Sequence, residues 1–100
     1  MLRGTTPTVV MTLPDDIDLS GADVAYLSFG QGGTDIFDLP IDRLTLADNV
    51  CTATLTQTET LSLTSGTKTQ IQLRWKEGAT AYGTKIVSVL TDAILKDGAI

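Results

Sequence analysis

The acidic residues near the start of the chain have the clearest potential for ligand chemistry. Four aspartates, Asp15, Asp16, Asp18 and Asp23, fall within one short segment, and oxygen-rich loops are what Ca²⁺ binds. An EF-hand loop needs ligands at further fixed positions and a bidentate glutamate at its end, whereas this run breaks after Asp18. The spacing therefore favours a solvated turn whose aspartates accept backbone N–H groups, with calcium binding as the weaker alternative.

Nucleophilic catalysis lacks its usual base in this sequence. The chain contains no histidine, so no Ser-His or Cys-His pair can remove a proton from a nucleophile at neutral pH. The single Cys51 alternates with polar residues and is expected to face the core, whereas a reactive thiol needs an electropositive, partly exposed setting. A zinc site would have to use carboxylates alone, which zinc does not favour. We therefore predict no enzyme activity, no cofactor and no metal centre.

Length and charge limit the remaining classes of function. One hundred residues, with 42% hydrophobic and 19% charged, are typical of one globular domain over residues 1–100. The net charge of −5 argues against nucleic-acid binding, which depends on Lys and Arg neutralising phosphates. No apolar run approaches the roughly 20 residues that span a bilayer, and the first residues do not resemble a secretory signal. We expect synthesis in a reducing cytoplasm and no membrane partner.

The elements that would carry these residues are short strands, because apolar and polar residues alternate with a period of two. The pattern predicts strands over residues 8–13, 24–29, 34–39, 50–56, 70–76 and 82–95, with a further short one near 44–46. Gly32-Gly33 predicts a tight hairpin turn, and Thr56 with Glu59 has the spacing of a capping box that begins a short helical turn. Trp75 is in phase with inward-facing residues, which indicates a core position.

The whole pattern predicts an all-β fold. We expect an immunoglobulin-like antiparallel β-sandwich of six or seven strands with at most one short helical turn, with a small barrel as the alternative. The immunoglobulin pattern of two cysteines around a tryptophan is missing, since Cys51 is the only cysteine.

Two of the predicted strands are apolar on both faces. Tyr26 is on the other face of its strand from the inward-facing Leu27. Ile86 and Leu90 are likewise on the other face of their strand from Val87. Such strands are either covered on both sides or expose one face as an interface, and ordinary exposed apolar residues are an equally good explanation. We predict interface residues on this second face and at the chain ends. They are Leu2, Arg3, Tyr26, Ile86, Leu90 and Ile100.

Three stretches carry a resemblance to a known group of proteins. They are GTTPTVVMTLP at 4–14, DLSGADV at 18–24 and ILKDGAI at 94–100. Together they resemble short proteins encoded among the tail genes of prophages in Gram-positive bacteria, and the first two are similar to the N-terminal domain of phage baseplate upper proteins.

This resemblance implies a β-sandwich without enzyme activity that docks on other phage tail or baseplate proteins or on copies of itself. It also implies synthesis in the bacterial cytoplasm and association with the virion tail. The chain lacks the stalk and receptor-binding parts of the baseplate proteins, so an adaptor role is expected rather than binding to a host receptor. The alternative prediction is a small carbohydrate- or calcium-binding β-sandwich module, motivated by the aspartates between 15 and 23.

Overall fold

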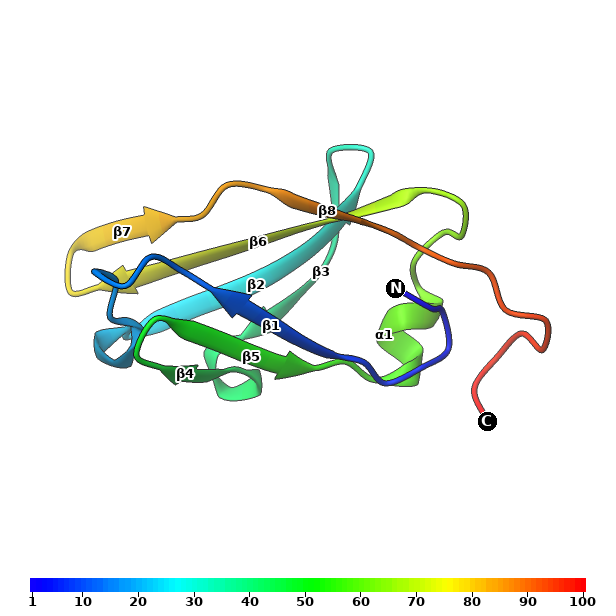
Figure 1. Cartoon of the computed structure of the whole chain (residues 1–100), viewed down its shortest axis with the longest axis horizontal. Helices are drawn as coiled ribbons and strands as arrows, with labels where there is room; N and C mark the ends of the chain where they lie inside the picture. The colour runs from blue at the N-terminus through cyan, green and yellow to red at the C-terminus, as the bar shows by residue number, and fades with distance from the viewer.

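The computed structural model describes residues 1–100, and most of its regular secondary structure is antiparallel strand (Figure 1). The strands are β1 (Thr8–Thr12), β2 (Val24–Gln31), β3 (Thr34–Pro40), β4 (Thr45–Ala47), β5 (Val50–Thr54), β6 (Lys68–Glu77), β7 (Thr80–Gly83) and β8 (Val87–Leu90). One short helix, α1 (Gln57–Leu61), and two 3₁₀ turns, η1 (Leu19–Gly21) and η2 (Ile41–Arg43), complete the chain. The helix matches the predicted helical turn, whereas the 3₁₀ turns have no counterpart in the prediction.

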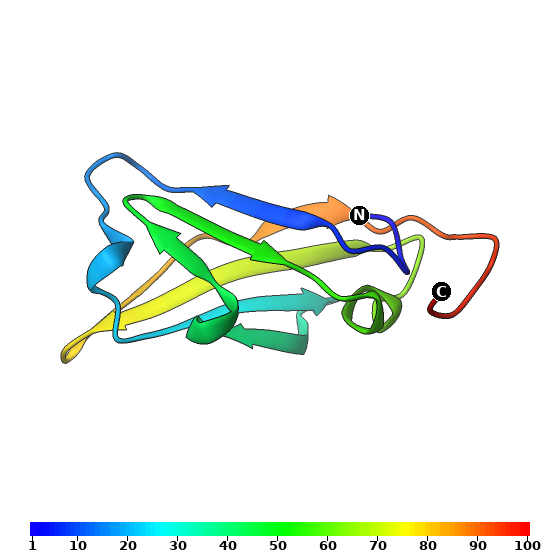
Figure 2. The same cartoon turned by 90° about the horizontal axis from the view of Figure 1, so that it is seen from below.

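The strands form two stacked layers, as the edge-on view shows (Figure 2). The small sheet has the order β1-β5-β4, and the large sheet has the order β3-β2-β6-β7 with β8 also paired to β6. Every strand-to-strand pairing is antiparallel. The predicted all-β sandwich is therefore confirmed.

The last predicted strand, over 82–95, is instead divided into β7 and β8. β7 pairs with the Glu77 end of β6, and β8 pairs with its Lys68 end. Between them, the Thr84 hydroxyl accepts the N–H of Leu73 at 3.1 Å, in place of a backbone carbonyl. A side chain thus interrupts the ladder, and β8 ends at Leu90, before the predicted end. The sandwich has eight strand segments rather than six or seven for this reason.

The core lies between the inner faces of the two sheets. Its fully buried members include Leu27 and Phe29 on β2, Leu73 on β6, Cys51 on β5, and Leu55 just after β5. Each was predicted to face inward from the alternation alone. Trp75 is also buried and stacks on Tyr82 with ring centroids 5.3 Å apart, which confirms its core position.

Local turn chemistry fixes how the strands connect. Gly32 and Gly33 have φ values of 60° and 79°, the left-handed conformation that a two-residue hairpin turn requires. Thr56 accepts the N–H of Glu59 at 3.1 Å, and the Glu59 carboxylate accepts the N–H of Thr56 at 2.8 Å, so the predicted capping box is present. Both features depend on sequence neighbours, which is why the sequence predicted them.

Candidate interaction surface

The large sheet leaves one of its faces uncovered, and this outer face gathers side chains from distant parts of the sequence. Residues directly opposite one another in an antiparallel pair point to the same side of a sheet. Tyr26 lies opposite Arg74, and Ser28 lies opposite Asp38. Val24 lies opposite Lys76, which in turn lies opposite Ala81. The outer face is defined here by these seven residues together with Asp35, which lies next to Asp38. Its members are Val24, Tyr26, Ser28, Asp35, Asp38, Arg74, Lys76 and Ala81.

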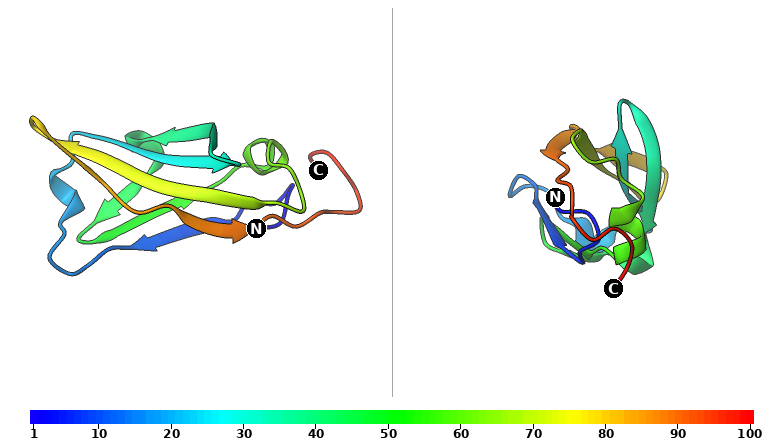
Figure 3. Two further views of the ribbon diagram at one scale, coloured as in Figure 1. Left: turned by 90° about the horizontal axis from the view of Figure 1, so that it is seen from above. Right: turned by 90° about the vertical axis from the view of Figure 1, so that its right-hand side faces the viewer.

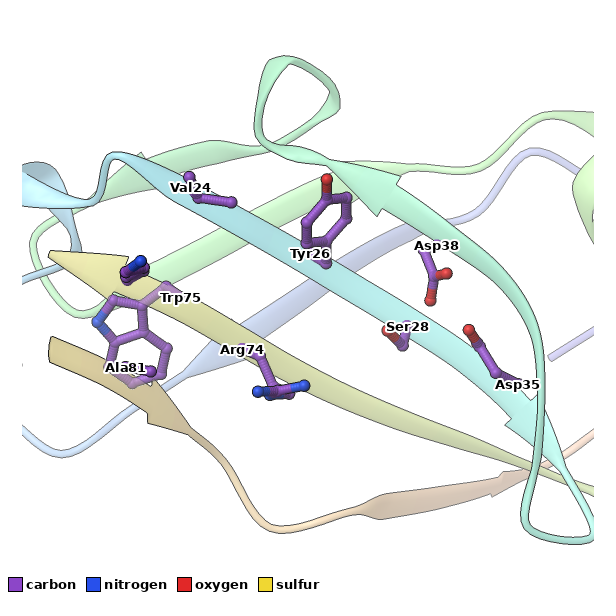
Figure 4. A pocket seen from close by; sticks show the side chains of 9 residues that line it. Val24, Tyr26, Ser28, Asp35, Asp38, Arg74, Trp75 and Ala81 are labelled. Carbon is purple, nitrogen blue, oxygen red and sulfur yellow. The ribbon is translucent and has the colours of Figure 1, made fainter. Parts of the chain in front are cut away.

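A hollow of about 410 Å³ occupies the middle of the outer face (Figure 4). Tyr26 stands on one side of it, Arg74 on another, and the carboxylates of Asp35 and Asp38 point toward one another above Ser28. A second hollow of about 260 Å³ continues from Asp35 and Arg74 to Ile86. Pockets that hold small ligands have volumes of about 300–1,000 Å³, so the first hollow is large enough for a side chain or a small ligand.

The two cations of the outer face form no ion pair within the chain. The three ion pairs of the molecule join Met1 to Asp92, Arg3 to Asp97 and Arg43 to Glu59, so Arg74 and Lys76 have no acidic partner. On the other side of the hollow, a side-chain hydrogen bond with Asp38 raises the pKa of Asp35, and desolvation adds to this shift. The surface therefore presents two cations without acidic partners beside the Asp35 and Asp38 carboxyl groups.

The structure brings three of the predicted interface residues to this side of the sheet. Tyr26 is 48% exposed, Ile86 is 56% exposed and lines the second hollow, and Leu90 is 55% exposed and pairs with Lys68. No loop covers them, so the outer face is open. Both large apolar side chains and free charges are therefore available to a partner.

The predicted residues at the chain ends lie elsewhere and are partly engaged within the chain. Arg3 donates from Nε to the Leu63 carbonyl at 2.7 Å and from Nη2 to the Leu61 carbonyl at 3.0 Å, so its guanidinium ties the N-terminal segment to the end of α1. Leu2 forms an isolated bridge with Asp92. Ile100 remains almost fully exposed, with its N–H donating to Gln57.

Two of the four aspartates between 15 and 23, Asp18 and Asp23, accept backbone N–H groups. Asp18 accepts the N–H and the hydroxyl of Ser20, and these two hydrogen bonds lower the pKa of Asp18. Asp23 accepts the N–H of Gly78 at 2.7 Å, on a different turn. Asp15 and Asp16 are exposed, and the chain contains no group of three or more His, Cys, Asp or Glu side chains that could hold a metal ion. The hydrogen bonds of Asp18 are those of a capped turn, which the sequence favoured over a calcium site in this segment.

Cys51 and Ser65 can be compared with the settings that nucleophilic catalysis needs. Burial raises the pKa of Cys51 from 9.0 to about 11, which opposes formation of a thiolate at neutral pH. In some enzymes without a histidine base, the lysine of a Ser-x-x-Lys spacing activates the serine. This chain has one such spacing, in which Ser65 lies on a turn and Lys68 is the first residue of β6. No hydrogen bond joins their side chains.

Sequence reasoning missed the polar half of the outer face. Alternation along β6 could have placed Arg74 beside Tyr26, had the pairing of β2 with β6 been known. Asp35 could not have been placed, because the register between β2 and β3 shifts at Phe29/Gly30. That bulge brings Asp35 to the side of Asp38.

Fold and surface together define the class of this protein as a two-sheet β-sandwich with an open, mixed apolar and charged sheet face. No helix in the structure is long and apolar enough to cross a membrane. No protein-family model, curated protein or solved structure matches the chain.

Proposed function

We propose that this protein is a non-enzymatic structural or assembly module of a phage or prophage tail or baseplate, and that it acts by binding other proteins through the outer face. The observation that carries the proposal is the uncovered outer face, with Tyr26 half-exposed beside Arg74. Tyr and Arg are the residue types most enriched among side chains that dominate interface energy. The tail assignment itself is supported by the sequence resemblance at 4–14, 18–24 and 94–100.

The mode of binding follows from the same side chains. A partner that fills the 410 Å³ hollow with an apolar side chain would bury Tyr26, and a partner carboxylate could pair with Arg74 in a bidentate geometry. Truncating such a central aromatic or arginine anchor typically costs about 2 kcal/mol or more of binding energy. Lys76 would add a salt-dependent contribution at the rim.

The test is assembly in a strain that carries the tail genes. We expect the protein to be present in purified tails or to be required for their assembly, and a Tyr26→Ala/Arg74→Glu variant to fail in either role. Thr54→Ala, an exposed change on the small sheet, is the matched control and should assemble normally. Tails that assemble normally without the protein, and that do not contain it, would refute the proposal.

A second candidate function is carbohydrate binding, favoured by the hollow itself. An exposed tyrosine ring beside carboxylates and an arginine offers both an apolar platform and hydrogen-bonding groups to one ligand. Titration with a panel of oligosaccharides tests it, and binding that disappears in Tyr26→Ala would support it. A ligand at 100 times its Kd should stabilise the fold by about 2.7 kcal/mol, so an unchanged melting temperature with every sugar and with Ca²⁺ would exclude both ligand-binding alternatives.

A further inference from the structure

Strand β1 is an edge strand without the usual protection against pairing. β5 is the only strand that pairs with it, and no charged residue occurs between Arg3 and Asp15. Its sequence TVVMT consists largely of β-branched residues, which favour strand pairing. Val10, at its centre, is 61% exposed. Proteins usually blunt an edge with charge, a bulge or a very short strand, and β1 has none of these.

The backbone groups on the free edge belong to Thr8, Val10 and Thr12. Leu13 donates to Asn49 at 2.8 Å and Leu55 donates to Pro7 at 2.9 Å, at the two ends of the β1–β5 ladder. Hydrogen-bonded pairs alternate with non-bonded pairs in an antiparallel ladder, so the odd-numbered residues of β1 bond to β5. The N–H and C=O groups of the even-numbered residues therefore point away from the sheet, and none of them has another partner.

The other edges of the sandwich are protected. β3 carries Asp35 and Asp38 and contains the bulge, and β4 is only three residues long. β7 and β8 have four residues each and are separated by a segment that contains Lys85. β8 borders the same side of the sandwich as β1 but belongs to the other sheet (Figure 3). β1 is therefore the edge strand of the sandwich that lacks charge, a bulge and a short length.

We infer that β1 pairs with β1 of a second copy of this chain, antiparallel and about a two-fold axis at Val10. In this register Val10 lies opposite its own copy, and Thr8 lies opposite Thr12 of the second copy. Each pair exchanges both of its free N–H···O bonds. Cross-strand threonine pairs are favourable, and the chain already contains one, between Thr8 and Thr54 with hydroxyl oxygens 3.1 Å apart.

A flanking proline limits the length of this ladder. The next hydrogen-bonded pair would join Thr6 to Pro14 of the second copy, and proline has no N–H to donate. The ladder therefore ends at Thr8 and Thr12. The two small sheets would become one continuous sheet of order β4-β5-β1-β1-β5-β4, which leaves the outer face of each large sheet free for other partners.

The lack of charge along this edge fits an uncharged strand, such as β1 of a second copy, better than an acidic or basic peptide. Each chain carries a net charge of −5, so two copies repel one another over most of their surfaces. The segment from Gly4 to Pro14, which contains β1, is uncharged, so two such chains can approach along it. Raising the salt concentration screens the remaining repulsion, so dimerisation should strengthen with salt.

The test is molar mass by analytical ultracentrifugation over a concentration series, at low and high salt. We expect a monomer–dimer equilibrium in the wild type, and a loss of dimer in Val10→Lys, which places like charges opposite one another on the axis. Thr45→Lys is the matched control, because it introduces the same charge on the same sheet but at the opposite edge, and it should dimerise like the wild type. Melting curves of both variants check that they remain folded.

A cross-link makes the register testable. Cα atoms of a hydrogen-bonded antiparallel pair lie about 5.5 Å apart, within the range of about 4.4–6.8 Å that a disulfide spans. Val10→Cys should therefore form a covalent dimer under mild oxidation, and Thr45→Cys should not. A wild type that stays monomeric at every concentration, or a dimer that Val10→Lys leaves intact, would overturn the inference.

This inference rests on the proposed assembly function for its role, but it uses a different surface. Loss of tail assembly in Tyr26→Ala/Arg74→Glu with dimerisation unchanged would support the outer face alone. A monomeric wild type with outer-face binding intact would refute the β1 pairing and leave the proposed function standing.

Discussion

The inner and outer faces of β2 differ in how far their side chains are buried. Leu27 is 0% exposed and packs in the core, whereas its neighbour Tyr26 is 48% exposed on the outer face. The inner residues hold the two sheets together, and the outer residues contribute little to that packing. We therefore expect substitutions on the inner face to lower stability, and substitutions on the outer face to act mainly on the proposed partner binding.

The largest expected effect comes from the inner face. Leu27→Ala should lower the free energy of unfolding by about 2–5 kcal/mol, because it leaves a cavity between the sheets. Tyr26→Ala, one residue away, should change it by less than about 0.5 kcal/mol, as exposed substitutions usually do. Urea unfolding of the two variants measures both values. Equal losses would show that the outer face also stabilises the fold.

Gly30 is the expected exception on the outer side of β2. A Cβ atom at this position would meet the Thr34 carbonyl oxygen at 2.6 Å, across the β2–β3 bulge. Gly30→Ala should therefore destabilise the protein by about 1–3 kcal/mol, the typical cost of overpacking. Where space is available, the same change usually stabilises by about 0.4–1 kcal/mol. Thermal unfolding decides the sign, with Ser28→Ala on the same face as a near-neutral control.

Thr56 shows that an exposed residue can matter through its hydrogen bonds. Its hydroxyl accepts the Glu59 N–H and begins α1. Thr56→Ala should cost about 1 kcal/mol of unfolding free energy, and Thr56→Ser should restore most of it because the hydroxyl is retained. Denaturant unfolding of the two variants tests this. A neutral Thr56→Ala would mean that α1 is held by tertiary packing alone.

The smallest expected effect concerns Cys51 on the inner face of β5. Its folded pKa of about 11 lies above the ordinary value of 9.0 because the thiol is buried. Below pH 9 the thiol is protonated in both the folded and the unfolded protein, so it does not lower the free energy of unfolding. Between pH 9 and 11 the unfolded thiol ionises more readily than the folded one, so the free energy of unfolding falls as the pH rises. The difference in unfolding free energy between the wild type and Cys51→Ala should therefore change with pH only in this window.

Labelling at Cys51 provides an independent measure. A thiol reagent at pH 8 should react slowly with the folded protein and rapidly after unfolding in urea. Rapid reaction in the folded state would place Cys51 at the surface and contradict the division between the two faces.

The sequence by itself determined the features that depend on neighbouring residues. Alternation predicted the inward side of 24–29, 50–56 and 70–76, because successive side chains of a strand point to opposite faces whatever the strand pairs with. The Gly32-Gly33 turn and the Thr56–Glu59 capping box were also predicted, since each closes over a few residues.

Only the tertiary structure decided which strands are neighbours, and with them the candidate site. Tyr26, Asp38 and Arg74 meet because β2 pairs with both β3 and β6, and no local pattern encodes that order. The bulge that places Asp35 and the hydroxyl of Thr84 that divides the last strand both depend on a partner strand. Pairing is a long-range choice among similar short strands, whereas the face of each residue is fixed by its immediate sequence.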